Sequence, residues 1–444
     1  MSTPPPAEPA PVAEADSPPR PSFREATRFW LKLGLISFGG PAGQIAIMHT
    51  ELVERKKWIA DSQFLHALNF CMLLPGPEAQ QLATYIGWLV HRTWGGIVAG
   101  ALFVLPSVLI LWLLSFVYMQ YGSIAWVAAA FTGLKPAVLA IVAAAVIRIG
   151  KKALKNKVMW GIAGLAFVAI FFFKAPFPAI VIGAGLLGWI GSRYWRKVFV
   201  AIKGHGEAGE STASSLSESP RPSLFRSLRL VVVCVLLWWI PVFVAGQFLG
   251  PKHTVTQEGV FFSKAAMVTF GGAYAVLPYV AQKAVDDHGW LEPEQMLDGL
   301  GLAETTPGPL IMVVQFVGFV GAWQHPGDLP PILAATYGAL LTTWVTFVPC
   351  FLWILLGAPY IERLHGHRGL TGALSTITAA VVGVILNLAL WFGLHVLLPD
   401  GNPDWFGVLI CATAFLAMLR WKVDILWIVA VGCALGILAH LASA

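Results

Sequence analysis

Apolar runs of about 20 residues recur along most of this chain, separated by short polar or basic stretches. A run of that length can cross the hydrocarbon core of a bilayer as one helix. So many runs in series exclude a soluble protein, because a soluble surface needs more charge than the 12% of charged residues found here. The pattern therefore predicts an all-α polytopic membrane protein.

Two stretches depart from the apolar pattern. Residues 1–22 are rich in proline, alanine and acidic residues and lack the apolar region of a signal peptide, so we predict a disordered cytoplasmic tail. Residues 201–227 include the polar run GESTASSLSESPRP, which predicts a cytoplasmic linker. These stretches divide the chain into an N-terminal repeat over 23–200, a linking transmembrane helix over 228–250 and a C-terminal repeat over 251–444.

The two long segments resemble each other in sequence. FWLKLGLISFGG begins at Phe29 and FFSKAAMVTFGG begins at Phe261, an offset of 232 residues. Without any gap, the same offset aligns Trp58 with Trp290, and Pro75-Gly76-Pro77 with Pro307-Gly308-Pro309. Composition bias does not hold a lysine, a tryptophan and a Pro-Gly-Pro in one register, so the chain contains an internal repeat.

The number of apolar segments predicts that the second half is inverted. Each half has about six segments, and one unmatched segment lies between the halves. Basic residues concentrate in alternate loops, which predicts a cytoplasmic N-terminus and an external C-terminus. The basic stretch Arg55–Lys57 fits this orientation only if the first two segments of each half are re-entrant hairpins. Broken helices that cross the bilayer remain the alternative.

Clustered glycines and prolines interrupt these first two segments of each half. The breaks contain Gly39–Pro41 and Pro75–Pro77 in the first half, and Gly271-Gly272 and Pro307–Pro309 in the second. Proline and glycine end helices, and unpaired backbone in hydrocarbon costs several kcal/mol, so such breaks survive only where they line protein or a cavity. Each break should start a new half-helix, whose N-terminus attracts anions. Paired broken segments predict a transporter's binding site, although simple kinks are the alternative.

Charged and amide side chains near the breaks complete the candidate site. Lys32 and Lys264 share one repeat position and either serve the site or extend to the membrane surface. Glu78 and Glu304 flank the Pro-Gly-Pro motifs and either cap a helix or couple protons. Arg148 is placed in a basic loop and is expected to affect topology more than affinity. The candidate substrate-binding residues are Lys32, Gly39, Gly40, Pro41, Gly43, Gln44, Pro75, Gly76, Pro77, Glu78, Gln80, Gln81, Lys264, Gly271, Gly272, Pro307, Gly308 and Pro309.

We predict no catalytic residue, no metal site and no cofactor. The five cysteines show no ligand spacing. Gly183, Gly185 and Gly188 match a dinucleotide fingerprint, but they lie inside an apolar run and fit helix packing better. The net charge of +6 comes from short loops and follows the positive-inside rule, so nucleic acid is not an expected partner.

The segments LGLISFGGPAGQIAIMH and LLPGPEAQQLATYIG closely resemble the chromate ion transporter (CHR) family, in its long two-domain type. The resemblance extends from about Phe23 to the C-terminus. It implies a multi-pass protein of the bacterial inner membrane that exports chromate and confers resistance to it. The second half departs from the motif, because Ala273 replaces Pro41 and Leu310 replaces Glu78 at the equivalent positions. The two halves are therefore expected to do different work.

Three functions remain open from the sequence. The first is an oxyanion exporter, with chromate as substrate and sulfate as a competitor. The second is an uptake transporter for sulfate or a related oxyanion, and the third is a membrane-embedded enzyme. Since an inside-negative potential pushes a dianion outward by roughly 4 to 5 kcal/mol per 100 mV, the energetics favour export. The bilayer is the expected environment, and a homodimer is left open.

Overall fold

The computed structural model describes residues 21–38, 40–199, 224–360 and 368–443. The predicted tail, most of the predicted linker, and Gly39 lie outside these ranges. Across the described ranges the secondary structure is helical, without a strand. Six of these helices are long and apolar enough to cross a membrane: α4, α5, α9, α14, α16 and α18. The prediction of an all-α polytopic membrane protein is confirmed.

The first half opens with a re-entrant hairpin of two short helices. Helix α1 (Phe23–Ile36) is followed, across the first break, by α2 (Gly40–His49) and the π-helical turn η1 (Thr50–Arg55). Lys56 Nζ, just after η1, lies 3.5 Å from Glu25 Oε1 in the first turn of α1. The chain therefore enters and leaves on one side, as the basic charge of residues 55–57 predicts.

A second hairpin follows on the same side. Helix α3 (Asp61–Cys71) leads to the first Pro-Gly-Pro and then to α4 (Glu78–Tyr121). Helix α4 folds back on itself at His91 and Arg92, where Arg92 has φ 54°. Its two arms touch so closely that a Cβ on Gly87 would lie 2.4 Å from the Gly95 oxygen. The His91 ring lies 5.4 Å from that of Phe23, so the returning arm ends beside the start of α1.

The outer arm of α4 and three further helices complete the first half. They are α5 (Ala125–Ala153), α6 (Lys157–Phe173) and α7 (Phe177–Tyr194), and the short α8 (Arg196–Phe199) follows. The linking helix α9 covers Leu224–Phe248 and so begins inside the predicted linker, four residues before the predicted position 228. At 25 residues it is long enough to carry the chain to the opposite side.

The second half repeats this order from the other side. Its first hairpin consists of α10 (Thr254–Val268), α11 (Ala273–Ala281) and the π-helical η3 (Gln282–Asp287). Its second hairpin consists of α12 (Pro293–Thr305), the 3-10 turn η4 (Leu310–Met312) and α13 (Val313–Gln324). His253 Nε2, before α10, donates to the Pro326 oxygen at 3.1 Å, which joins the start of one hairpin to the end of the other.

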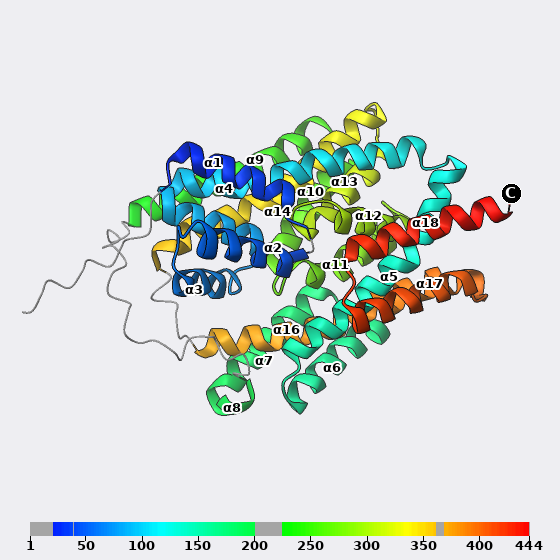
Figure 1. Ribbon diagram of the computed structural model, residues 1–444. Coiled ribbons are helices and arrows are strands. Elements are labelled where there is room, and N and C mark those ends of the chain that lie inside the picture. The colour runs from blue at the N-terminus through cyan, green and yellow to red at the C-terminus, as the bar shows by residue number, and fades with distance from the viewer. Residues whose placement is uncertain (1–20, 39, 200–223, 361–367, 444) are drawn as a thin grey trace, which may run out of the picture.

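The last helices correspond to the outer arm of α4 and to α5, α6 and α7. They are α14 (Pro331–Gly357), α16 (Arg368–Leu397), α17 (Trp405–Leu416) and α18 (Ile425–Ser443), with short turns η5 (Ala358–Tyr360), η6 (Pro399–Gly401) and η7 (Ala417–Trp421). In Figure 1 the start of α1 lies at the left and the end of α18 at the right, at opposite ends of the molecule.

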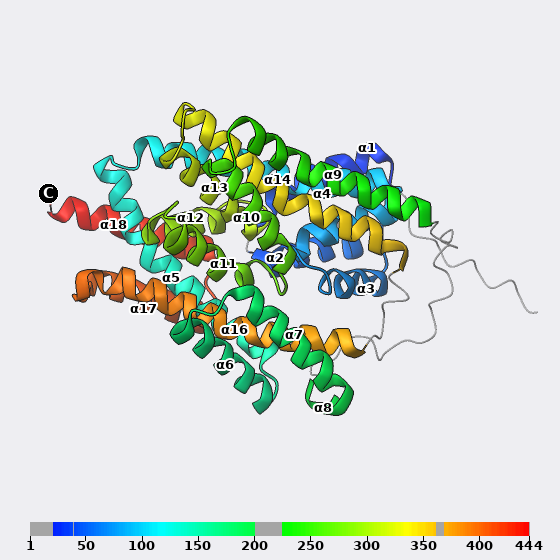
Figure 2. The ribbon, with the colours of Figure 1, turned by 180° about the vertical axis from the view of Figure 1, so that it is seen from behind.

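The two halves pack against each other through equivalent helices. Helix α16 packs on α6 and α7, while its counterpart α5 packs on α17 and α18. Figures 1 and 2 show this layer beside a second layer, in which α1, α4, α9, α10, α13 and α14 lie together. Such an exchange of partners is what an approximate two-fold axis between inverted repeats requires.

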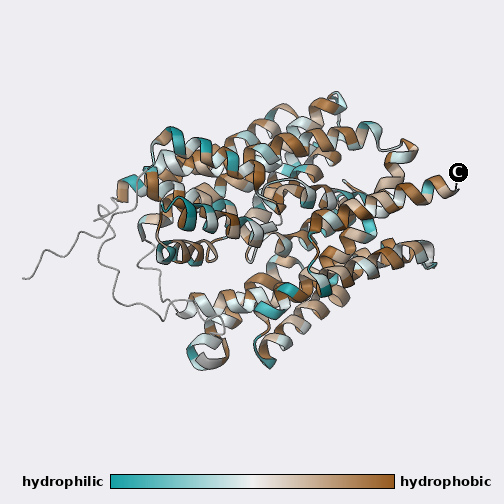
Figure 3. Ribbon diagram, viewed as in Figure 1, coloured by the Kyte–Doolittle hydropathy of each residue, from teal (hydrophilic) through white to brown (hydrophobic). Residues whose placement is uncertain are grey.

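The outward faces of the helices are apolar, as expected for a protein surrounded by lipid. Figure 3 shows hydrophobic residues along most of the outer helices. Large exposed apolar side chains follow α6, α7 and α9 and include Leu165, Phe172, Ile182, Leu186, Leu236, Ile240 and Phe243. Exposed apolar patches of this extent identify a membrane-facing surface.

Candidate functional site

The four predicted breaks meet at the interface between the two halves. The amide N–H of Gly76 donates to the Thr269 oxygen at 2.7 Å, and the N–H of Gly308 donates to the Ser37 oxygen at 2.8 Å. Gly308 is the repeat equivalent of Gly76, and Thr269 is that of Ser37, by the same offset of 232 residues. Each bond therefore joins a Pro-Gly-Pro of one half to the Gly-Gly break of the other.

These two bonds use N–H groups that precede the new helices. Gly76 and Gly308 each lie directly before the proline at the start of the next helix, and their N–H groups hold the two halves together. Both glycines have positive φ angles, 126° and 111°, which side-chain-bearing residues rarely adopt. Glycine is thus needed here to bring the two backbones into contact.

Residues that follow the lone helix prolines complete this contact. A Cβ on Gly76 would lie 2.6 Å from Cys350 Sγ, and one on Gly308 would lie 2.7 Å from Ser107 Cβ. Cys350 follows Pro349 in α14, and Ser107 follows Pro106 in α4. Neither these prolines nor the residues that follow them belong to the candidate site predicted from the sequence. The sequence signal that could have identified Cys350 and Ser107 is that each directly follows the lone proline of its half.

Three helices begin at the breaks without a side-chain cap. They are α4 after Pro77, α11 after Gly272, and η4 after Pro309. The first N–H groups of a helix have no acceptor within that helix, and the N-terminus carries about half a positive charge. The breaks therefore place several anion-attracting helix ends near one another, in addition to the start of α2 at Gly40.

Amide side chains line the same region. Gln44 Nε2 donates to the oxygens of Gly308 and Ser37, and Gln81 Nε2 donates to the Pro75 oxygen at 2.7 Å. Gln44, Gln80 and Gln81 are completely buried, and each keeps one side-chain oxygen without a hydrogen-bond partner. Buried polar atoms are normally paired, so these amides mark a polar centre inside an apolar protein.

An arginine that the sequence placed in a loop belongs to this centre. Arg148 lies within α5, and its Cζ is 6.0 Å from the centre of the Tyr274 ring. The Tyr274 hydroxyl donates to Glu304 Oε1, and the charge of Arg148 acts on both groups. Tyr274 lies at the start of α11 and Glu304 one residue before the end of α12, so this cluster joins the two breaks of the second half. The loop placement of Arg148 was wrong because the apolar run of α5 continues through the basic residues.

Glu78 of the first half lies close to the Gly-Gly break of the second half. A Cβ on Gly272 would lie 4.0 Å from Glu78 Oε1, and the positive charge of Lys152 acts on the Glu78 carboxyl group. Lys152 lies one turn after Arg148 on α5. The charges of Arg148 and Lys152 on α5 thus act on the two carboxyl groups that flank the Pro-Gly-Pro motifs.

The two predicted lysines both lie outside the contact between the breaks. Lys32 in α1 and Lys264 in α10 are both exposed, and neither forms an ion pair with another described residue. The packed face of α1 consists instead of Ala26, Phe29, Trp30, Leu33 and Gly34. The structure therefore does not bring either lysine into the packed contact between the breaks. Gly40, Pro41 and Gly43 lie at the start of α2, beside that contact.

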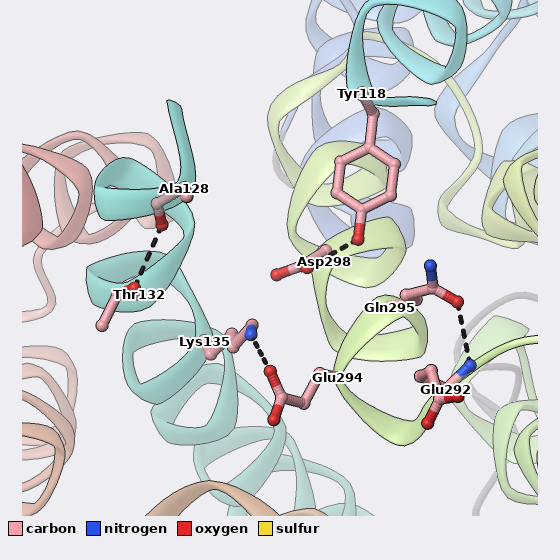
Figure 4. Close-up of polar contacts among 8 residues, drawn as sticks. All are labelled: Tyr118, Ala128, Thr132, Lys135, Glu292, Glu294, Gln295 and Asp298. Atoms are coloured by element: carbon pink, nitrogen blue, oxygen red, sulfur yellow. Dashed lines mark hydrogen bonds and ion pairs between the residues drawn. The ribbon is translucent and has the colours of Figure 1, made fainter. Parts of the chain in front are cut away.

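A separate polar group holds the outer end of α12. Lys135 of α5 pairs with Glu294, and one turn deeper the Tyr118 hydroxyl of α4 donates to Asp298 Oδ2 at 2.9 Å (Figure 4). Asp298 is buried, whereas Glu294 is exposed. These contacts hold α12, the first helix of the second hairpin, against α4 and α5 of the first half.

The remaining motifs have structural roles. A Cβ on Gly188 would lie 2.3 Å from the Gly372 oxygen, so this glycine allows α7 and α16 to approach each other. Among the described residues, no group of three or more His, Cys, Asp or Glu side chains is placed to hold a metal ion.

Comparison with known proteins agrees with this architecture. A family model described as "Chromate transporter" matches residues 24–189 and 257–437, one segment in each half. The "Chromate transport protein" of Cupriavidus metallidurans is 29% identical over 87% of this chain and 86% of its own length. That of Pseudomonas aeruginosa is 31% identical over 83% of this chain and 80% of its own length.

Shorter relatives match about a third of this chain. The "Uncharacterized transporter YwrB" of Bacillus subtilis is 31% identical over 34% of this chain and 75% of its own length. No solved structure matches this chain.

Proposed function

The chain belongs to the chromate transporter family, and from that premise we propose that it exports chromate across the bacterial inner membrane. Export would be driven by the membrane potential or by a proton gradient and would confer chromate resistance. Chromate is a tetrahedral dianion, so an inside-negative potential favours its exit by roughly 4 to 5 kcal/mol per 100 mV. No coupled ion is required in that direction.

One observation carries the proposal: the reciprocal hydrogen bonds that join Gly76 to Thr269 and Gly308 to Ser37. They bring the breaks of both halves to one place, where helix N-termini from both sides converge. A site on the approximate two-fold axis between inverted repeats can be reached alternately from either face when one half moves against the other. This geometry supports a transporter more than an enzyme.

The anion is proposed to bind at the uncapped starts of α4 and α11, with Arg148 of α5 as its cationic partner. Backbone N–H groups and helix ends suit a tetrahedral oxyanion because each oxygen can accept several hydrogen bonds. In the structure Arg148 acts on Tyr274 and Glu304. An arriving dianion would take Arg148 as its partner, and Glu304 would keep its hydrogen bond from Tyr274.

The backbone and amide groups at the breaks complete the proposed site. Gln44, Gln80 and Gln81 would orient the anion, while Lys32 and Lys264 would attract it from the two faces, because both lysines are exposed. The site would hold no resident cofactor. Whether sulfate competes, and whether two copies associate, are outcomes for the experiment.

Transport into everted membrane vesicles tests the proposal. Vesicles that contain the protein should accumulate labelled chromate when an interior-positive potential is imposed, and unlabelled sulfate should reduce that accumulation if it shares the site. Arg148→Gln should weaken uptake, whereas Arg193→Gln, an exposed basic residue of α7, should not. Accumulation only in right-side-out vesicles would support sulfate or oxyanion uptake instead. Absence of transport in both orientations would contradict a transporter.

A further inference from the structure

One carboxyl group of the second half is buried without any partner. Glu258 lies in the second turn of α10, is 0% exposed, and neither of its carboxyl oxygens has a hydrogen-bond partner. Its surroundings are shaped by two glycines. A Cβ on Gly321 of α13 would lie 2.6 Å from Oε1, and one on Gly338 of α14 would lie 2.7 Å from Oε2.

Within the described ranges, no charged group compensates this carboxyl group. Helix α10 packs against α9, α11, α13 and α14. The titratable side chains of those helices are Arg226, Arg229, Cys234, Tyr274, Tyr279, Tyr337 and Cys350, and His253 and Lys264 lie on or next to α10 itself. Among the described residues, none of these charges acts on Glu258, and none forms an ion pair with it. An ionised carboxylate is very unfavourable in such a place, so this packing holds the neutral acid.

The group is specific to the second half. Ala26 occupies the equivalent position of the first half, by the offset of 232 residues, and packs in the core. The repeat therefore does not require a carboxyl group at this position. The glutamate adds a proton-binding group that the first half lacks here.

We propose that Glu258 binds the proton that couples anion movement to the pH gradient. This inference rests on the proposed transport function and names its coupling ion. The carboxyl group lies five residues from His253, where the second-half hairpins begin and end together. That side is external if the N-terminus is cytoplasmic. A proton from external water would neutralise Glu258 and allow α10 to pack on Gly321 and Gly338.

Release of the proton would reverse this packing. The carboxylate would need water, so α10 would separate from α13 and α14, and the hairpin would shift relative to the first half. The proton would then leave to water on the cytoplasmic side. One proton would thus enter for each anion that leaves.

The test uses everted vesicles with the potential clamped to zero, so that only the pH gradient acts. In wild type, acidifying the interior by one pH unit should raise the steady-state chromate accumulation about tenfold if one proton exchanges for one anion. Glu258→Gln should keep transport driven by potential but lose the response to the pH gradient. Glu292→Gln, an exposed carboxyl beside α12, is the matched control and should behave as wild type.

A second measurement does not depend on transport. An apolar carbodiimide modifies protonated carboxyl groups in membranes, so it should label Glu258 at neutral pH, more slowly as the pH rises, and not in Glu258→Gln. A pH-gradient response that persists in Glu258→Gln would overturn the inference, and so would a wild-type protein that transports without any such response. If wild type does not transport chromate, the proposed function fails and the labelling alone decides whether Glu258 binds a proton; no labelling would refute it.

Discussion

Replacement of Gly76 by valine tests whether the contact between the breaks is part of the transport machinery. Gly76 has φ 126°, a conformation that costs a side-chain-bearing residue about 1–3 kcal/mol. Its Cβ would also lie 2.6 Å from Cys350 Sγ, and overpacking of that kind costs about 1–3 kcal/mol. Together these effects destabilise the observed contact by roughly 2–6 kcal/mol, which corresponds to at least about thirtyfold in its population.

A double-mutant cycle separates the two contributions. Cys350→Ala removes the sulfur atom that meets the new side chain, so Gly76→Ala combined with Cys350→Ala should recover about 1 kcal/mol or more relative to the sum of the single changes. The equivalent site offers a control. Gly308→Ala meets the Cβ of Ser107 at 2.7 Å, and Ser107→Ala keeps that atom. Ser107→Ala should therefore give little recovery.

The assay is chromate accumulation in everted vesicles at matched amounts of inserted protein. Gly76→Val and Gly308→Val should be nearly inactive. Gly40→Val should be less severe, because Gly40 has φ 69° but no neighbouring atom lies within 4 Å of the place that a Cβ would take. Gly164→Val, on the exposed face of α6 with no close neighbour, should be normal. If Gly76→Val inserts normally and transports at the wild-type rate, the breaks are only kinks and the proposed site is wrong.

The same geometry makes three further predictions. Arg148→Ala should weaken the apparent affinity for chromate by roughly 10- to 150-fold, which corresponds to a charged hydrogen bond of about 1.5–3 kcal/mol. Lys32→Ala should weaken this affinity less. Equal effects of the two variants in transport kinetics would contradict the role of Arg148 in anion binding. Cysteines introduced at Lys56 and Gly289 should react with an impermeant thiol reagent from opposite sides of the membrane, and reaction from one side would contradict the inversion. Residues 1–199 and 224–444, expressed as two polypeptides, should co-purify and restore transport that neither provides alone, because both reciprocal hydrogen bonds lie between them; failure to associate would show that the linking segment is required.

The repeat and its breaks could be predicted from the sequence because both are local patterns. Phe-Gly-Gly and Pro-Gly-Pro interrupt apolar runs, and a backbone without partners cannot face lipid, so helix ends had to occur there. The structure places helix ends at these positions. In the first half α1 ends at Ile36 and α4 begins at Glu78, and in the second half α10 ends at Val268 and η4 begins at Leu310. The basic residues 55–57 favoured the re-entrant path without excluding helices that cross, and the contact of Lys56 with Glu25 agrees with re-entry.

Only the tertiary structure decides which residues of the breaks form hydrogen bonds with one another. The pairing of Gly76 with Thr269 joins residues almost 200 positions apart, and no local pattern records which N–H group finds which carbonyl. Arg148 looked like a loop residue until the packing of α5 placed it over Tyr274. Glu258 belongs to none of the sequence motifs, and it is unusual only because Gly321 and Gly338 enclose it. Periodicity specifies which residues form helices, whereas the surroundings of a side chain depend on how distant helices pack around it.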